Sequence, residues 1–159
     1  MTPLNETESF VLLRLSERRF AVSAGDIAEL VAPSRIFRFP HQTKEIEGVI
    51  LRRGRIVPVI DVAARLIGKK LTSRRFYLIA QRRYTAGTEW IALPVTGDCE
   101  LISAEMIPAS AADLPHVAGW LSHDGDVIEV LNLNALTPGP SPAPLSAPAA
   151  NTVRQEAFS

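Results

Sequence analysis

The sequence predicts a mainly β protein in which two similar small barrels pack together. Three observations carry this prediction. Short runs rich in Val, Ile and aromatic residues alternate with turn-forming residues over most of the 159 residues. The chain also repeats itself after a shift of 71 residues. Hydrophobic residues make up 47% of the chain, which supplies enough apolar surface for a folded core.

The predicted strands are short, and turn-forming segments such as SERR, RRGR and HDGD separate them. Because proline cannot donate a hydrogen bond to a neighbouring strand, Pro58 and Pro94 place their strands at a sheet edge or at a bulge. The runs are FVLLRL (10–15), RFAV (19–22), RIVPVI (55–60), FYLIA (76–80), WIALPV (90–95) and DVIEVL (126–131).

Short helices are expected between some of these strands. Asp61 is placed to cap the N-terminus of VAARLI (62–67), and Gly68 is placed to end that helix. The segment LISAEMI (101–107), which precedes Pro108, fits either one helical turn or a continuing strand. Neither outcome would change the mainly β prediction.

The repeat divides the chain into two units. A shift of 71 residues places GVILRRGRIVPVIDV (48–62) over GWLSHDGDVIEVLNL (119–133), and residues 20–64 then show eight identities with their counterparts. Unrelated stretches of that length would share about three. Each unit has the size of a five-stranded SH3-like barrel, and units this small need a neighbour to bury enough surface.

We therefore predict one domain over residues 1–136 that contains two pseudo-symmetric, five-stranded SH3-like barrels. The two repeats cover about residues 9–70 and 71–136, and strands can be exchanged between them. After this domain, TPGPSPAPLSAPA (137–149) alternates Pro with small residues and offers nothing to bury. Residues 137–159 are therefore predicted to be a disordered, Pro-rich tail.

Charge is sorted along the chain, although 17 basic and 17 acidic side chains give a net charge of zero. Residues 1–83 contain 16 basic and 8 acidic side chains, a net charge of +8. Residues 84–136 contain 8 acidic side chains and no Lys or Arg, a net charge of −8. The zero total argues against a general polyanion binder, and the sorting predicts a basic barrel and an acidic barrel.

Sequence motifs for catalysis are missing. The chain contains no G-x-x-x-x-G-K-[ST], no G-x-G-x-x-G and no G-x-S-x-G. Its three histidines do not cluster at metal-ligand spacing, and Asp98 and Glu100 are expected to raise the pKa of the Cys99 thiol between them. We therefore predict no enzyme, no catalytic residue, no metal and no cofactor.

The expected location is the cytoplasm. No basic segment followed by an apolar one marks a secretory signal, and no run of about 18 apolar residues is available to span a membrane. The single cysteine cannot form an internal disulfide.

The two hairpin turns differ in charge although they occupy equivalent places in the repeat. RRGR (52–55) places Arg53 over Asp124 and Arg55 over Asp126 of HDGD. Gly in each turn supplies the backbone angles that a tight hairpin needs, so both turns are also compatible with simple solvation. Arginines on a rigid turn suit the recognition of carboxylates on a partner, which makes Arg53 a candidate binding residue.

The sequence resembles the CheW-like domain family of bacterial chemotaxis signalling. The resemblance extends over about residues 9–136 and includes the opening strand pair, ELVAPSRIFRFP, the WIALPV–VTGDCEL segment and GWLSHDGDVIEVLNL. The two SH3-like barrels of the family agree with the internal repeat. Within GVILRRGRIVPVIDV, the positions that fit the family pattern are Gly48, Val49, Arg53, Gly54, Val57, Pro58, Val59 and Asp61.

This resemblance implies an adaptor that performs no chemistry itself. Family members couple the cytoplasmic tips of methyl-accepting chemoreceptors to a histidine kinase whose regulatory domain has the same two-barrel fold. The receptor helical hairpin contacts the groove between the barrels, and the kinase regulatory domain contacts barrel ends. Such a protein would be cytoplasmic and would join membrane-associated receptor arrays without inserting into the membrane.

The resemblance also implies partner-binding residues. Arg53 and Gly48 belong to the family motif, and Ile27 and Glu29 lie on the strand that borders the receptor groove. Each has a simpler alternative: solvation for Arg53, backbone geometry for Gly48, core packing for Ile27 and a solvated strand edge for Glu29. The neighbouring arginines of the turn, Arg52 and Arg55, complete the candidate set.

Departures from the family pattern leave alternatives open. Leu51 and Arg52 replace the usual Asn-Leu before Arg53, and Asn132 stands where an acidic residue is usual. A related pathway such as twitching motility is therefore an alternative to flagellar chemotaxis.

Two further functions remain as alternatives. The +8 half would permit a nucleic-acid-binding SH3-like module, although aromatic residues make up only 6% of the chain, and no nucleic acid is expected as a partner. Capture of Pro-rich peptides would require an aromatic groove, for which Trp90 and Trp120 are candidates.

Overall fold

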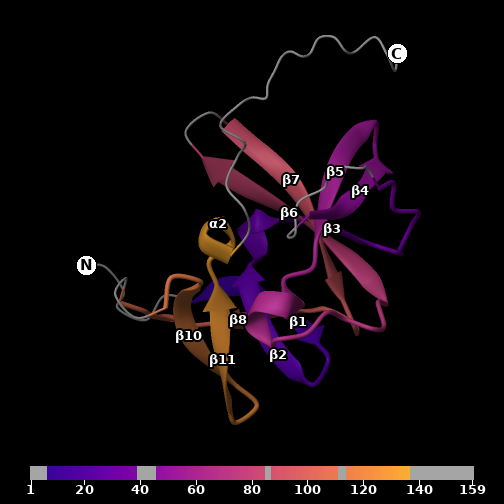
Figure 1. Cartoon of the computed structure of the whole chain (residues 1–159). Helices are drawn as coiled ribbons and strands as arrows, with labels where there is room; N and C mark the ends of the chain where they lie inside the picture. The colour runs from indigo at the N-terminus through magenta and orange to yellow at the C-terminus, as the bar shows by residue number, and fades with distance from the viewer. Residues whose placement is uncertain (1–6, 39–45, 85–86, 111–113, 137–159) are drawn as a thin grey trace.

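The computed structural model describes residues 7–38, 46–84, 87–110 and 114–136. In this part of the chain, eleven strands form two curled sheets that pack against each other (Figure 1). The predicted Pro-rich tail, 137–159, lies outside the described residues.

One sheet has six strands and the other has five. The six-stranded sheet contains β1 (Glu8–Leu15), β2 (Arg18–Ser23), β8 (Glu100–Ala104), β9 (Ile107–Pro108), β10 (Val117–His123) and β11 (Asp126–Leu131), in the order β8-β1-β2-β11-β10-β9. The five-stranded sheet contains β3 (Ile27–Val31), β4 (Ile46–Arg52), β5 (Arg55–Ile60), β6 (Phe76–Tyr84) and β7 (Gly87–Val95), in the order β3-β6-β7-β5-β4. The 3-10 turn η1 (Ala24–Asp26) and the one-turn helices α1 (Ala63–Leu66) and α2 (Leu133–Leu136) connect or end the strands.

The mainly β fold class is confirmed. All six predicted runs are strands, and two short helices follow the hairpins of the repeat. The segment 101–107, which fitted either a helical turn or a strand, forms most of β8 and the start of β9. The six-stranded sheet exceeds the expected five because β9 adds a two-residue strand at its edge.

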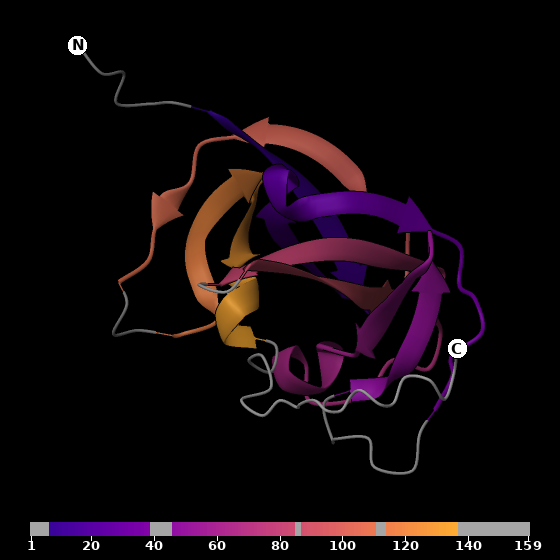
Figure 2. The ribbon, with the colours of Figure 1, turned by 90° about the horizontal axis from the view of Figure 1, so that it is seen from above.

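The two sheets exchange hairpins. The hairpin β1–β2 of the first repeat joins the second-repeat strands β8 to β11, and the hairpin β6–β7 of the second repeat joins β3, β4 and β5. Each hairpin is joined on both sides: β1 pairs antiparallel with β8 and β2 parallel with β11, while β6 pairs antiparallel with β3 and β7 parallel with β5. In Figure 2 the indigo hairpin β1–β2 lies in the same half of the molecule as the orange strands β10 and β11. Neither sheet is therefore built from one contiguous repeat, 9–70 or 71–136.

The pseudo-symmetry is visible in matching local details. Both repeats have a register shift before their glycine, between Ile46 and Gly48 and between Val117 and Gly119. Helix α1 follows Asp61, whose Oδ1 accepts a hydrogen bond from the Ala63 amide at 3.0 Å. Asn132 Oδ1 accepts the equivalent bond from the Asn134 amide at 3.2 Å. The predicted cap at Asp61 is thus present, with Gly68 beyond the helix in a left-handed conformation at φ 82°.

Both sheets share the main hydrophobic core. Its fully buried side chains include Leu15 and Phe20 from the β1–β2 hairpin and Ala80 and Ile91 from the β6–β7 hairpin. Each large apolar side chain buried in this way contributes roughly 1.5–3 kcal/mol. Because the exchanged hairpins supply both sides of this core, the two halves stabilise one another.

Pro58 and Pro94 lie on interior strands, so of the two predicted positions, a sheet edge or a bulge, the edge is wrong. The bulge alternative agrees, for Pro58, with the register shift in the neighbouring strand β4. Strands β5 and β7 both have neighbours on two sides. The parallel contact between these strands consists of the Val59–Ala92 pair, so neither proline has to donate to a long ladder there. The register shift in β4 lies opposite Val59 and Ile60, next to Pro58.

The strands of the two sheets do not divide into a basic and an acidic set. The six-stranded sheet carries three basic and four acidic side chains on its strands, and the five-stranded sheet carries four basic and three acidic ones. The exchanged hairpin brings basic β2 beside acidic β11, where Arg19 Nη2 lies 2.8 Å from Asp126 Oδ2. The strand exchange therefore mixes charges that are separated along the sequence.

Two equivalent glycines allow segments of each barrel to approach closely. A Cβ atom on Gly48 would lie 2.5 Å from Ile36 Cγ2 and 2.7 Å from the Phe37 carbonyl oxygen. A Cβ atom on Gly119 would lie 2.5 Å from the Ile107 carbonyl oxygen. Both positions therefore exclude any side chain.

We expect Gly48→Ala and Gly119→Ala each to lower the free energy of unfolding by about 1–3 kcal/mol, because the new methyl group overlaps backbone atoms. Gly25→Ala is the matched control, since its Cβ would meet nothing closer than Ser23 Oγ at 3.9 Å. Urea unfolding followed by tryptophan fluorescence measures all three. Equal stability of Gly48→Ala and Gly25→Ala would contradict this packing role.

Candidate functional site: an arginine–glutamate cluster and an inter-sheet cavity

The β4–β5 hairpin presents Arg53 at its tip. Arg52 and Arg55 form the last pair of the ladder, which leaves a two-residue loop of Arg53 and Gly54. Both loop residues have positive φ, 54° and 76°, as a type I′ hairpin requires. The left-handed conformation costs a non-glycine residue about 1 kcal/mol, and Arg is not among the residues that favour it. Turn geometry alone therefore does not explain why an arginine occupies the tip.

Glu29 joins two arginines of this hairpin. Arg52 donates from Nε to Glu29 Oε2 at 2.8 Å and from Nη2 to Oε1 at 2.9 Å. Arg53 donates to the same two oxygens, at 3.3 Å from both Nε and Nη2. Strands β3 and β4 are the two edges of the five-stranded sheet, so this cluster bridges the edges where the sheet curls round.

The cluster holds Glu29 ionised. Hydrogen bonds from Arg52, and secondarily from Arg53, lower the pKa of Glu29 from its ordinary 4.5 to about 2, against a smaller opposing effect of burial. The Glu29 side chain is only 16% exposed, whereas the Arg53 side chain is 65% exposed. Two guanidinium groups over one carboxylate leave a net charge of +1 at an exposed position.

Arg55 is held on the other side of the turn. Its guanidinium carbon lies 4.2 Å from the centroid of the Trp90 ring on β7, a cation–π contact. Leu51 and Ile56 pair with each other on the opposite face of the hairpin, where both are exposed. Together, Arg52, Arg53 and Glu29 form what we call the arginine cluster.

The structure places the six predicted site residues in different surroundings. Arg52, Arg53 and Glu29 meet in the arginine cluster, whereas Arg55 contacts Trp90 on the other side of the turn. Ile27 packs against the main core at the other end of β3, which agrees with its core-packing alternative. Gly48 serves the close approach of Ile36 and Phe37 and is not in the cluster. A partner-binding role for any of the six stays a prediction.

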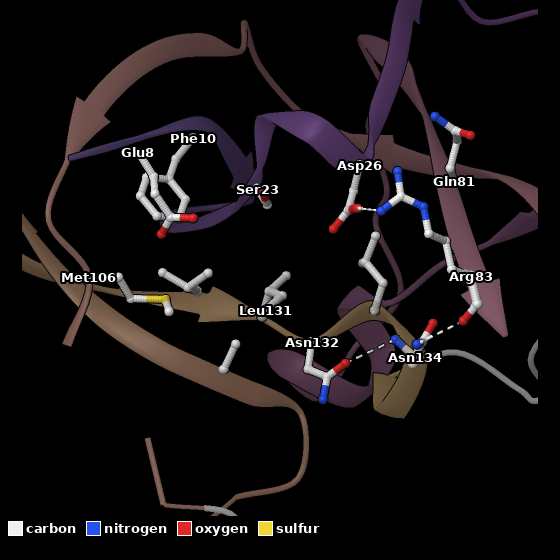
Figure 3. Close-up of a pocket in the computed structure, with 13 residues that line it drawn as sticks. Glu8, Phe10, Ser23, Asp26, Gln81, Arg83, Met106, Leu131, Asn132 and Asn134 are labelled. Carbon is white, nitrogen blue, oxygen red and sulfur yellow. Dashed lines mark hydrogen bonds and ion pairs between the residues drawn. The ribbon is translucent and has the colours of Figure 1, made fainter. Parts of the chain in front are cut away.

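A cavity of about 290 Å³ lies where the two sheets meet. Its lining residues come from β1, β2, η1, β6, β10, β11 and α2, and from the short connections that contain Met106 and Asn132. Phe10, Met106 and Leu131 supply apolar surface (Figure 3). Asp26 and Arg83 point toward each other at the rim, with Arg83 Nη1 3.9 Å from Asp26 Oδ1.

Sequence reasoning missed this cavity because its residues are far apart in the chain. Asn134 on α2 donates from Nδ2 to the Arg83 carbonyl oxygen on β6 at 3.0 Å, which ties the two sheets together at the rim. Ile27 follows Asp26 directly and pairs with Ala80, beside the cavity residue Gln81, so it borders the cavity without lining it. No local pattern marks these residues; the strand exchange brings them together.

Cys99 does not have the properties of a nucleophile. Burial, and secondarily the charge of Asp98, raises the pKa of the thiol to about 11. The described residues contain no group of three His, Cys, Asp or Glu side chains arranged to hold a metal ion. Among the same residues, no helix is long and apolar enough to cross a membrane.

Glu29 should make stability depend on pH. Because its folded pKa lies below the unfolded value, the stabilisation is complete above pH 4.5 and is lost as the pH falls from 4.5 toward 2. We expect Glu29→Gln to lose less stability than the wild type over this interval, as measured by urea unfolding at a series of pH values. Identical pH dependence of the two proteins would show that Glu29 is not held by the arginines.

Comparisons with known proteins agree with this architecture. Residues 9–84 match the model of the CheW-like domain family. A probable chemotaxis protein CheW from Rhizobium etli is 29% identical over 134 residues, which cover 79% of this chain and 84% of that protein. The crystal structure of the scaffolding protein TtCheW from Thermoanaerobacter tengcongensis superposes with a TM-score of 0.67 at 25% identity, covering 83% of this chain and 87% of that one.

The matched segment 9–84 contains the β4–β5 hairpin and four strands of the five-stranded sheet, including both strands that form the arginine cluster. The resemblance first read from GVILRRGRIVPVIDV is thus confirmed. A CheW-like domain is found at residues 9–84 of this chain.

Proposed function

We propose that this protein is a non-catalytic adaptor that couples chemoreceptor cytoplasmic tips to a chemotaxis-type histidine kinase. The observation that carries the proposal is the arginine cluster. Arg53 stands at a rigid hairpin tip, exposed and charged, at the motif position that the CheW-like family shares. A guanidinium held in this way can form two parallel hydrogen bonds with a carboxylate of a partner.

The second partner surface of the proposed adaptor is the inter-sheet cavity. Its apolar floor and polar rim suit the side chains of an amphipathic helical hairpin such as a receptor tip. The cavity and the arginine cluster lie at different places in the fold, so the molecule can contact two partners at once. In this role the protein works in the cytoplasm beside membrane-associated receptor arrays.

The nucleic-acid alternative gains no support from the basic half of the chain. Carboxylates engage Arg19, Arg52, Arg74 and Arg82, which therefore do not offer free charges to phosphates. Capture of Pro-rich peptides is also not favoured, because Trp90 and Trp120 lie on different sheets and form no common groove.

We expect Arg53→Glu to weaken binding of the kinase regulatory domain or the receptor tip by at least about 10-fold, because it opposes a partner carboxylate with a like charge. Isothermal titration calorimetry with each purified partner measures the effect. Arg75→Glu is the matched control, since the Arg75 side chain is similarly exposed (61%) but lies directly before β6, outside the arginine cluster. Unchanged affinity of Arg53→Glu for both partners would remove the arginine cluster from the binding site.

A bulky residue at the cavity should weaken binding of the receptor tip and spare binding of the kinase. We expect Gln81→Trp, which adds a bulky side chain at the wall of the cavity, to weaken receptor-tip binding at least about 10-fold and to leave kinase binding within about 2-fold. Gln81→Ala, which removes side-chain volume, is the control for loss of the amide. If Gln81→Trp weakened binding of both partners equally, the proposal that they bind to separate surfaces would be wrong.

A further inference from the structure

Arg52 binds Glu29 through shorter hydrogen bonds than Arg53 does. The Arg52 bonds, at 2.8 and 2.9 Å, have the length of charge-assisted hydrogen bonds. The Arg53 bonds, both at 3.3 Å, are longer than that range. The exposed fractions follow the same order, because the Arg52 side chain is 37% exposed and the Arg53 side chain 65%.

We propose that Arg52 is a positioning residue that occupies Glu29 and so leaves Arg53 available to a carboxylate of the partner. This inference rests on the proposed function, since it assumes that Arg53 contacts a partner. It assigns Arg52 a role different from direct contact.

Without Arg52, Arg53 would be the only arginine of the cluster bonded to Glu29. Its guanidinium would then form the bidentate pair itself, and the cluster would be neutral instead of carrying a charge of +1. To bind a partner, Arg53 would have to leave a largely buried carboxylate unpaired, which is unfavourable. With Arg52 in place, Glu29 keeps two short hydrogen bonds after Arg53 turns away.

The carboxylate has the capacity for this arrangement. Its two oxygens offer about four lone-pair sites, so one Glu can accept bonds from two guanidinium groups. Arg52 lies on β4 within the ladder, where its backbone is fixed by pairing with Arg55. Arg53 lies in the two-residue loop, from which its side chain can reach outward. The strand position holds Glu29, and the loop position serves the partner.

The test compares Arg52→Met, Glu29→Gln and the double variant by calorimetry, with whichever purified partner, kinase regulatory domain or receptor tip, Arg53→Glu binds more weakly. Methionine keeps much of the apolar stem of Arg52 without its charge. We expect Arg52→Met to weaken binding about 10-fold and the double variant to return to within about 3-fold of wild type, because Arg53 then has no competing carboxylate. If Arg52 only bridged β3 and β4, removing Glu29 as well would not restore binding.

A second measurement does not depend on the partner. NMR titration of the Glu29 carboxyl carbon should show a larger rise of its pKa in Arg52→Met than in Arg53→Met, because Arg52 makes the shorter bonds. If Arg52→Met does not fold, Arg52→Lys takes its place in both measurements. Lysine offers one point of contact and no fork, so a loss of about 3-fold is expected.

Two results would overturn the inference: wild-type affinity in the Arg52 variant, or failure of Glu29→Gln to restore binding. If the proposed function itself were wrong, different binding results would be seen. In that case the wild type would bind neither the kinase domain nor the receptor tip, or Arg53→Glu would bind as the wild type does. The titration would still report which arginine holds Glu29.

Discussion

The exchange of hairpins between the two sheets is the constraint on which the rest of this structure depends. Each small sheet lacks the apolar surface to stand alone, and each is completed by two strands from the other half of the chain. Phe20 from one hairpin and Ile91 from the other meet in a single core. The two repeats are therefore parts of one folding unit, and their relative position is fixed. Such rigidity suits the adaptor function that we propose.

The arginine cluster depends on the same architecture. The five-stranded sheet curls until its edge strands β3 and β4 face each other, and Glu29 then reaches Arg52 and Arg53 across the seam. The carboxylate becomes largely buried and strongly ionised, and its pKa falls to about 2. One arginine closes the seam while the other remains exposed at the hairpin tip. A single carboxylate thus links barrel closure to the charge that the surface offers a partner.

Sequence reasoning identified the members of the cluster but not their arrangement. The turn motif points to Arg53, the family resemblance points to Glu29, and Arg52 enters the candidate set only as a neighbouring arginine of the turn. That Arg52 makes the shorter bonds depends on distances of a few tenths of an ångström between strands that are 23 residues apart in the chain. Sequence patterns do not report such distances. The cavity rim formed by Asp26, Arg83 and Asn134 was missed for the same reason, since its residues come from both repeats.

The sequence by itself determined the strands, the tight turns, the cap at Asp61 and the internal repeat, because these follow from local backbone preferences and from a pattern that recurs after 71 residues. Tertiary structure decided which hairpin completes which sheet, and this choice placed Pro58 inside a sheet and mixed charges that the sequence keeps apart. The physical reason is that strand partners are selected by long-range burial and by backbone pairing between distant segments. These interactions join residues such as Phe20 and Glu129, which no local signal relates.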